Sequence, residues 1–354
     1  MWARDLVETG GALLALGCRR DARRILGYLI ATQQADGHWF QNQWLGGKPF
    51  WEGMQLDEAA FPVLLASALA ADDGLGHIDV RDMILRALRF IASNGPASAQ
   101  DRWEEEAGIN TFTLAVVIAA LVEGSRFLEP RGAECALMIA DAWNGQIEAA
   151  TRASGTVLAT ELGVTGYYMR SAPDDVLEYA GAKHRAVRVK NRNPGVELPA
   201  DEQVAIDCLQ LVRFGLRRAD DPLMLDSVAA IDATLKVDTP NGPVWRRYAG
   251  DGYGETADGA PFNGFKDVGL PQMRKLDSTA SEALTSVKVK IGDDYFLFAL
   301  AKGEQDAARN LDLMKTRAWF DFPLLLNDNR IAKLVFQKSA EGEAMLEKAF
   351  DAWK

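Results

Sequence analysis

The stretch "DRWEEEAGINTFTLAVVIAAL", Asp101–Leu121, joins a charged loop to a long apolar run. From Phe112 to Leu121 almost every residue is apolar, which indicates a helix that is buried on all sides rather than a surface helix. Asn110 and Thr111 stand where side-chain oxygens cap a helix by accepting backbone N–H bonds. Three successive glutamates, Glu104–Glu106, follow a tryptophan just before this helix. The loop therefore brings several carboxyl groups to the end of a buried element.

The same helical period continues through most of the chain. Apolar residues recur at three- and four-residue spacing in about ten segments. The expected helices cover, approximately, residues 6–16, 22–33, 56–71, 80–92, 110–127, 131–150, 201–218, 222–235, 295–301 with an extension to 314, and 342–353. No strict repeat of about 34 or 40 residues appears, which disfavours the common helical solenoids. We therefore expect helix pairs packed around a shared axis, with the long loops gathered at one end.

Two short stretches favour strands instead. "RAVRVK", residues 185–190, alternates apolar and basic residues, which is typical of one strand in a short pair. "TSVKVKIGDDYF", residues 285–296, reads as a strand followed by a turn. Neither stretch changes the expected fold class, which is all-α.

The composition of the chain limits the classes of partner that it is expected to bind. The 354 residues carry a net charge of −11, which argues against nucleic acid and anionic membranes as main partners because both are negatively charged. Neutral ligands are unaffected. The nine tryptophans and seven tyrosines suit stacking on flat apolar faces such as sugar rings, although core packing is the more common role of any one of them.

The remaining composition indicates no metal site and no cofactor. The three cysteines lie far apart in the sequence, and they match neither a disulfide framework nor a zinc spacing. The three histidines form no pair at helical spacing. No unbroken apolar run reaches the roughly 18 residues that a membrane span needs, and "MWARDLVETG" carries no signal-peptide pattern. The compartment stays open, since the chain could be cytoplasmic, or secreted if a signal lies upstream.

Polar and aromatic residues share each long loop. The stretches are "WARD" (2–5), "PFWEGMQLDE" (49–58), "RWEEEAG" (102–108), "VKNRNP" (189–194) and "WRRYAGDGYGE" (245–255). Each has an ordinary explanation when taken singly: a surface ion pair worth about 0–1 kcal/mol, carboxylates that complement a helix dipole, or a turn. Their recurrence in loop after loop indicates a binding or catalytic site.

The order and approximate spacing of these loops resemble the family 15 glycoside hydrolases, which include glucoamylases and bacterial relatives such as glucodextranases. The resemblance covers about residues 2–259, through "WARDLVETGGALLA", "DGHWFQNQWLGGKPFW", "QLDEAAFP", "DRWEEEAGINTFTLAVVIAALVEG", "GVTGYYMRSAP", "LVRFGLRRADDPLMLDS" and "VDTPNGPVWRRYAGDGYGE". It implies an (α/α)6 barrel of six helical hairpins. It also implies an inverting exo-acting hydrolase that releases β-glucose from the non-reducing ends of α-glucans.

The resemblance also implies roles for individual residues. Glu104 falls where the family has its general acid, and Glu255 falls where the bacterial branch has its general base. The positions that match substrate-binding residues are Arg4, Asp5 and Arg192, which would hold the terminal glucose, and Trp51, Trp103 and Glu105, which would line the neighbouring subsites. Tyr248 and Tyr253 would add hydroxyl donors around Glu255.

The chemistry of the residues agrees with these roles. An inverting glycosidase needs one protonated carboxyl and one carboxylate, about 6.5–9.5 Å apart, so that a water fits between the second group and the sugar. Like charge from neighbouring glutamates and burial against Trp103 favour the neutral form of Glu104, whereas the positive end of the following helix favours the anion. We expect repulsion and burial to prevail. The Gly-rich turn "GDGYGE" offers N–H groups that would keep Glu255 ionised.

The resemblance has limits at both ends. The chain opens at "MWARD", whereas the family places at least one barrel helix before this motif. After Gly259 the resemblance weakens, and residues 260–354 are hard to place. We expect one catalytic domain over residues 1–354, with a barrel incomplete at its N-terminus and divergent at its C-terminus. The alternatives are a glucodextranase or trehalase of the same family, or an inactive carbohydrate-binding or structural helical domain. Linkage, chain length and oligomeric state are not indicated.

Overall fold

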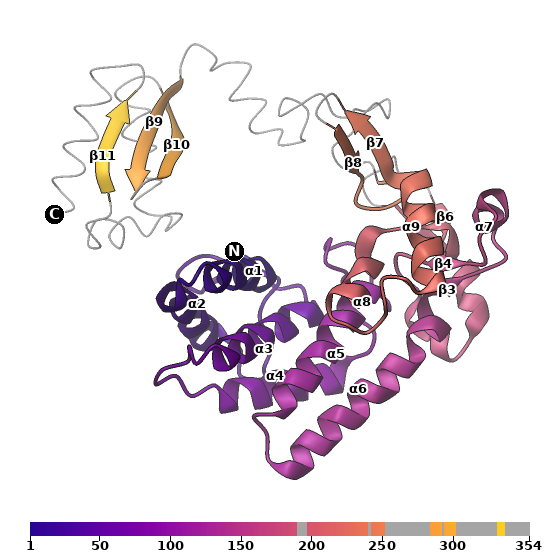
Figure 1. Ribbon diagram of the computed structural model, residues 1–354, viewed down its shortest axis with the longest axis horizontal. Coiled ribbons are helices and arrows are strands. Elements are labelled where there is room, and N and C mark those ends of the chain that lie inside the picture. The colour runs from indigo at the N-terminus through magenta and orange to yellow at the C-terminus, as the bar shows by residue number, and fades with distance from the viewer. Residues whose placement is uncertain (190–196, 240–241, 252–283, 292–293, 302–330, 337–354) are drawn as a thin grey trace. The chain divides into compact units, whose positions relative to one another are not determined.

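The computed structural model describes residues 1–189, 197–239 and 242–251, together with the backbone of three strands between residues 284 and 336 (Figure 1). It divides the chain into two compact units, residues 1–43 with 49–252 and residues 44–48 with 253–354. The sequence analysis expects a single domain over the whole length. The division near residue 252 lies close to Gly259, where the family resemblance weakens.

The first unit is built from three successive helical hairpins. Their helices are α1 (Ala3–Ala15), α2 (Arg19–Thr32), α3 (Leu56–Ala71), α4 (Arg81–Asn94), α5 (Thr111–Ser125) and α6 (Pro130–Thr151). Helices α1, α3 and α5 lie side by side, and α2, α4 and α6 pack against this row (Figure 1). This alternation of inner and outer helices is the arrangement expected for α/α hairpins.

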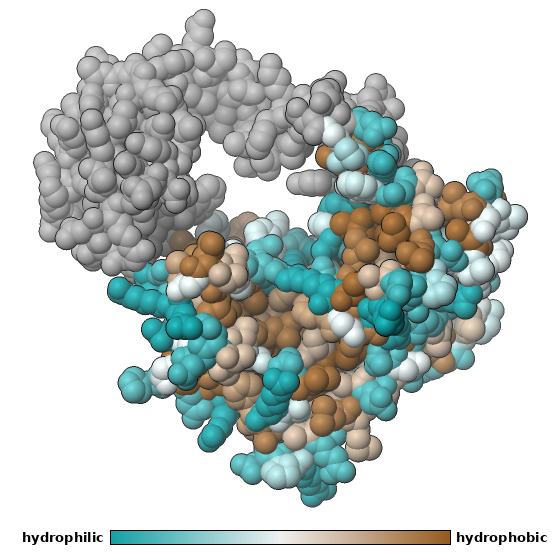
Figure 2. Space-filling view, viewed as in Figure 1, coloured by the Kyte–Doolittle hydropathy of each residue, from teal (hydrophilic) through white to brown (hydrophobic). Residues whose placement is uncertain are grey.

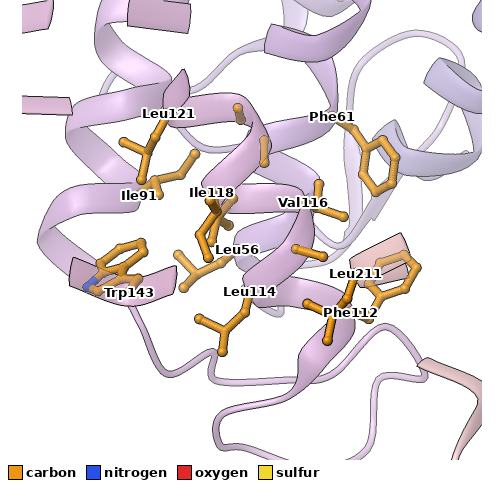
Figure 3. Packing of buried hydrophobic residues seen from close by; sticks show 14 of the residues in the cluster. Leu56, Phe61, Ile91, Phe112, Leu114, Val116, Ile118, Leu121, Trp143 and Leu211 are labelled. Atoms are coloured by element: carbon orange, nitrogen blue, oxygen red, sulfur yellow. The ribbon is translucent and has the colours of Figure 1, made fainter. Parts of the chain in front are cut away.

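Helices α3 and α5 are buried over most of their surface. Twelve of the 15 residues of α5 and 12 of the 16 residues of α3 are buried, whereas α2, α4 and α6 bury mainly one face. In Figure 3, Leu114 and Leu121 lie on the side of Ile91, and Phe112 lies toward Phe61, with ring centres 6.1 Å apart. The apolar run therefore forms the predicted buried helix. Neither α5 nor any other helix in the described ranges reaches the length and hydrophobicity of a membrane span.

Further helices and short strand pairs complete the first unit. The helices are α7 (Val157–Leu162), α8 (Leu209–Arg213) and α9 (Pro222–Leu235), with single 3-10 turns at Asp174–Leu177, Ala180–His184, Ala200–Glu202 and Ile206–Cys208. Antiparallel strand pairs are β1 (Asn42–Gln43) with β2 (Pro49–Trp51), β3 (Arg152–Ala153) with β4 (Tyr167–Tyr168), β5 (Ala186–Arg188) with β6 (Glu197–Pro199), and β7 (Lys236–Thr239) with β8 (Gly242–Trp245). The pair β5–β6 confirms the strand predicted at "RAVRVK".

The helix predicted over residues 201–218 is interrupted. Residues 203–205 are extended, because their backbone is used by neighbouring segments. The carbonyl of Gln203 accepts from the Arg170 N–H at 2.7 Å, and that of Val204 accepts from the Ala249 N–H at 2.7 Å. Helical structure resumes only from Ile206 onward, and α8 is five residues long. Tertiary pairing overrides the apolar periodicity here.

The described part of the second unit is a three-stranded antiparallel sheet in the order β10-β9-β11, formed by Leu284–Ile291 (β9), Asp294–Ala301 (β10) and Ile331–Phe336 (β11). The strand predicted at "TSVKVKI" is confirmed. The helix predicted over residues 295–301 is wrong, because "YFLFALA" pairs residue by residue with β9, from Asp294↔Ile291 to Ala301↔Leu284. A continuous apolar run of this length does not distinguish a helix from a strand by its period. The predicted segment 342–353 lies outside the described residues.

A hollow of about 620 Å³ lies on the surface over α3 and α5. Its apolar wall includes Leu64, Val122 and Phe214, and Figure 2 shows apolar side chains gathered over these two helices. The lining residues come from the C-terminal halves of α3 and α5 and from the end of α8 with the residues after it, whereas the charged loop 101–110 precedes the N-terminus of α5. The hollow therefore lies toward the end of these helices opposite that loop.

Substitution of two glycines in helices tests this packing. A Cβ atom on Gly124 of α5 would lie 2.8 Å from Leu88 Cδ1 and 2.9 Å from Val63 Cγ1, whereas the exposed Gly145 of α6 has no such neighbour within 4 Å. We expect Gly124→Ala to lower the free energy of unfolding by about 1–3 kcal/mol through overpacking. Gly145→Ala should raise it by about 0.5–1 kcal/mol through helix propensity. Urea unfolding measures both, and a Gly124→Ala protein as stable as the wild type would contradict the described contact.

Candidate active site

Arg4, in the first turn of α1, faces the first turn of α3. Its Nη1 donates to Gln55 Oε1 at 2.9 Å and to Asp57 Oδ2 at 2.5 Å, and its backbone N–H donates to Glu58 Oε2 at 2.7 Å. The side chains of Asp57 and Glu58 are fully buried, and that of Arg4 is 11% exposed. A buried ion pair thus fixes the direction of the guanidinium group before any ligand arrives.

Glu58 holds its proton more firmly than an exposed carboxyl group does. Burial raises the pKa of Glu58 to about 8, although the positive charge of Arg4 opposes this effect. The like charge of Asp57 adds to the increase in pKa. Glu58 is therefore largely neutral at pH 7, and the ion pair of Arg4 is formed with Asp57 at the shorter distance.

The N-terminal end of α1 also contacts the loop that carries the three glutamates. Arg4 Nη2 donates to the carbonyl of Arg102 at 3.2 Å, and the indole N–H of Trp2 donates to Glu104 Oε1. Two segments about a hundred residues apart in the sequence therefore meet at Glu104. The sequence analysis expected Arg4, Trp103 and Glu104 to share a site, and the structure brings them together.

The glutamate loop is closed by Asp101. The Asp101 N–H donates to the Glu106 carbonyl at 2.7 Å, and Asp101 Oδ1 accepts from the N–H groups of Trp103 at 3.1 Å and Glu105 at 3.0 Å. Within this loop Glu104 has φ of 65°, in the left-handed region that non-glycine residues seldom adopt. Such strained residues occur preferentially at functional sites, where surrounding contacts hold them in place.

Glu105 points into a cluster of donors. Its Oε2 accepts from Arg170 Nη2 at 3.0 Å and from the Tyr248 hydroxyl, and its Oε1 accepts from Arg247 Nη2 at 3.1 Å. Its side chain is only 7% exposed. Glu105 was expected to line a sugar subsite, and in this structure protein donors engage both of its oxygens.

Trp103 lies between two cations. The guanidinium carbon of Arg102 is 4.1 Å from the centre of its ring, and that of Arg247 is 4.8 Å from it. Arg102 in turn pairs with the buried Asp207 at 3.0 Å. These contacts fix the plane of the indole, so that Trp103 is held rigidly beside Glu104.

The other predicted site residues occupy varied positions. Asp5 is exposed on α1, and Trp51 on β2 is 50% exposed, with its ring centre 4.7 Å from that of Phe50. Tyr248 is fully buried. Arg192, Tyr253 and Glu255 lie outside the described residues. Among the residues that the structure describes, no three histidine, cysteine, aspartate or glutamate side chains are grouped as a metal ion would require.

Buried charged residues outside the predicted set support this site. Arg170, Asp101 and Asp251 are almost completely buried charged residues, and Arg247 bridges Glu105 and Asp251. One signal was available, because a single arginine after the apolar stretch "GYYM" indicates a buried charge with partners. An aspartate two residues before Trp103 is likewise typical of a side chain that caps a turn. Neither signal identifies the partners.

Buried inner helices with a loop cluster of carboxylates, arginines and tryptophans define a helical-hairpin protein with a polar site at one end. The family model of glycosyl hydrolases family 15 matches residues 33–320, and the chain belongs to this family. The match confirms the predicted family, and the solved relative described next confirms the (α/α)6 fold class.

Two relatives illustrate the similarity. The chain is 34% identical over 271 residues to a glucoamylase of Clostridium sp. (strain G0005), a match that covers 75% of this chain. It is also similar to the crystal structure of a bacterial glucoamylase complexed with acarbose, with a TM-score of 0.63 and 34% identity over 72% of this chain. Each match spans 36% of the relative's own length, so the chain matches about a third of either protein.

Glu58 makes stability depend on pH. In the folded protein Glu58 keeps its proton up to a pH of about 8, whereas in the unfolded chain its pKa returns to 4.5. The folded state therefore binds more protons between these values, and the free energy of unfolding falls as pH rises through this window. The slope from this one group is at most about 1.4 kcal/mol per pH unit.

We expect Glu58→Gln to remove this part of the slope, as measured by urea unfolding from pH 5 to pH 8. Asp72→Asn is the control. Asp72 pairs with Arg19 at the surface, and its side-chain hydrogen bond with Arg19 lowers its pKa, so it titrates below this window. Equal slopes for the wild type and Glu58→Gln would show that Glu58 is ionised in the folded protein.

Proposed function

We propose that these residues form the glycone-binding end of an inverting, exo-acting glycoside hydrolase that releases β-glucose from the non-reducing ends of α-glucans. One observation carries the proposal: the strained, half-buried Glu104 lies beside Trp103 and meets the end of α1 that holds Arg4. Its neighbour Glu105 turns instead toward protein cations. The family membership and the acarbose complex of the solved relative support a sugar as the ligand.

In the proposed reaction Glu104 is the general acid and Glu255 is the general base. Glu104 donates its proton to the glycosidic oxygen as the bond to the anomeric carbon breaks. Glu255 accepts a proton from the water that attacks the opposite face of that carbon, so that the configuration inverts and β-glucose forms. The role of Glu255 rests on its resemblance in "WRRYAGDGYGE", because this residue lies outside the described ranges.

Arg4 is proposed to hold the terminal glucose. Its guanidinium is pre-oriented by Asp57 and Gln55, so little conformational entropy remains to be lost when a sugar hydroxyl binds. Asp5, exposed on the same helix turn, adds an acceptor, and we assign Arg192 to the same sugar. Flat donors beside an acceptor suit the neighbouring hydroxyl groups of a pyranose.

The aromatic residues are proposed to bind the following sugars. Two guanidinium groups lie over the ring of Trp103, so Trp103 is proposed to line its subsite by the remaining part of the indole. Trp51 exposes half of its surface, and its face suits the C–H face of a pyranose ring. We propose that Tyr248 contributes indirectly, because its hydroxyl holds Glu105 by a hydrogen bond. We propose that Tyr253 supplies a hydroxyl donor near Glu255.

The two enzymatic alternatives share the proposed chemistry and differ in substrate. A glucodextranase would cleave α-1,6 linkages and a trehalase the α,α-1,1 linkage, with the same pair of carboxyl groups. An inactive carbohydrate-binding domain would bind sugar without turnover. A panel of maltooligosaccharides, isomaltooligosaccharides and trehalose distinguishes these cases.

The first test follows glucose release and optical rotation together. We expect the chain to release glucose from maltooligosaccharides, with the β-anomer formed first. An initial α-anomer would mean retention and would overturn the proposed mechanism. Binding of acarbose by titration calorimetry, without hydrolysis of any of the three substrates, would instead identify an inactive binding domain.

The second test removes each carboxyl group in turn. Glu104→Gln and Glu255→Gln should each lower kcat by about 100- to 10,000-fold, because each removes one proton-transfer step. Glu123→Gln is the control, since Glu123 lies near the C-terminal end of α5 and bonds Ser67. Circular dichroism verifies that the variants fold. Near-normal turnover in either variant would overturn the role assigned to that residue.

A further inference from the structure

Arg170 is the most deeply buried cation among the described residues near Glu104. Its side chain is 1% exposed. Its Nη2 donates to Asp101 Oδ2 at 2.7 Å and to Glu105 Oε2 at 3.0 Å, so one guanidinium group holds both sides of the glutamate loop. Its guanidinium carbon also lies 3.6 Å from the ring centre of Tyr248. Because it is enclosed in this way, Arg170 does not reach a sugar.

The same cluster holds the segment Arg247–Asp251. The Tyr248 hydroxyl donates to Glu105, and Arg247 donates to Glu105 on one side and to Asp251 at 2.6 and 2.8 Å on the other. Burial raises the pKa of the Tyr248 hydroxyl, which therefore remains a donor. Glu105 is thus the joint between the glutamate loop and this segment. Glu255, the proposed base, follows Asp251 by four positions in the sequence.

Backbone hydrogen bonds connect the segments that carry the cluster. Arg170 N–H donates to the Gln203 carbonyl, and Ala249 N–H donates to the Val204 carbonyl, both at 2.7 Å. Bridges between Met169 and Val204 and between Ala205 and Tyr248 extend this pairing. The extended residues 203–205 therefore tie the backbone around Arg170 to the backbone around Tyr248, and the side-chain cluster is built on a rigid frame.

We propose that Arg170 is a positioning residue, which holds the loop bearing Glu104 and the segment Arg247–Asp251 in one fixed arrangement through Glu105. In this arrangement Glu105 is the joint of the two segments. The inference rests on the proposed function of Glu104 as the acid. It adds the reason why the acid is held in its strained conformation.

The inference predicts a change in kcat with little change in KM. Displacement of a reacting group by about 1 Å can cost about 100-fold in rate, whereas ground-state binding of sugar by Arg4 and the tryptophans would be retained. A residue with a merely structural role would lower thermal stability without this separation of kcat from KM.

The test compares Arg170→Lys and Glu105→Gln with a matched arginine variant, Arg217→Lys. Arg217 also makes a bidentate pair, with Glu148 at 2.7 and 2.8 Å, and it bonds Asn144, but these partners lie on α6. Lysine keeps the charge and loses the planar fork and the stacking. Each protein is measured for kcat and KM on maltotriose, and for amide hydrogen exchange of residues 101–106 and 245–251.

We expect Arg170→Lys to lower kcat by about 10- to 100-fold, with KM within about threefold, and Glu105→Gln to lower kcat by a similar factor. Exchange should become about tenfold faster in both segments together. Arg217→Lys should leave both measurements unchanged. If Arg170→Lys fails to fold, Tyr248→Phe, which removes only the hydroxyl donor to Glu105, takes its place in the same comparison.

Three results would overturn the inference. The first is a Glu105→Gln protein with normal exchange in both segments, which would show that Glu105 does not join them. The second is unchanged exchange in either segment when Arg170 is replaced, and the third is an equal loss of kcat in Arg217→Lys. If the wild-type chain hydrolyses none of the substrates, the proposed function fails, while the exchange measurements still decide whether Arg170 joins the two segments.

Discussion

The site depends on the mutual compensation of buried charges. Arg170, Asp101, Glu105 and Asp251 lie almost entirely out of water, and Arg247 is largely covered. A charge in such a place is tolerated only when a partner lies close and the remaining donors and acceptors are bonded. Each carboxylate here contacts at least one guanidinium group, so the stability of each buried charge depends on the others. Removal of one member would leave another buried without compensation.

This requirement explains how loops from distant parts of the chain acquire a definite shape. The glutamate loop has no regular secondary structure, yet Asp101 ties its two ends together and Arg170 ties it to the segment around Tyr248. On the opposite side, Arg4 joins the same loop to the first turns of α1 and α3. The strain at Glu104 persists because the contacts on both sides over-determine its conformation.

The inner helices supply the platform for these contacts. Because α3 and α5 are apolar on all faces, they are packed into the row of hairpins, and the segments preceding them fall at the same end as the start of α1. Asn110 confirms the predicted cap by accepting from the Thr113 N–H at 2.8 Å. The platform is general, whereas the chemistry resides in the loops that it positions.

The sequence by itself determined the helices with strong apolar periods, such as α2 and α4, and the loops whose polar and aromatic residues indicate a sugar site. These features are local, since period, caps and turn residues act within a few positions of the chain. The tertiary structure alone decided that residues 203–205 are extended, that Asp294–Ala301 is a strand, and that Glu105 contacts Arg170. The strand depends on its pairing with β9, and the other two outcomes depend on partners up to 65 positions away. No local pattern contains the geometry of such pairings.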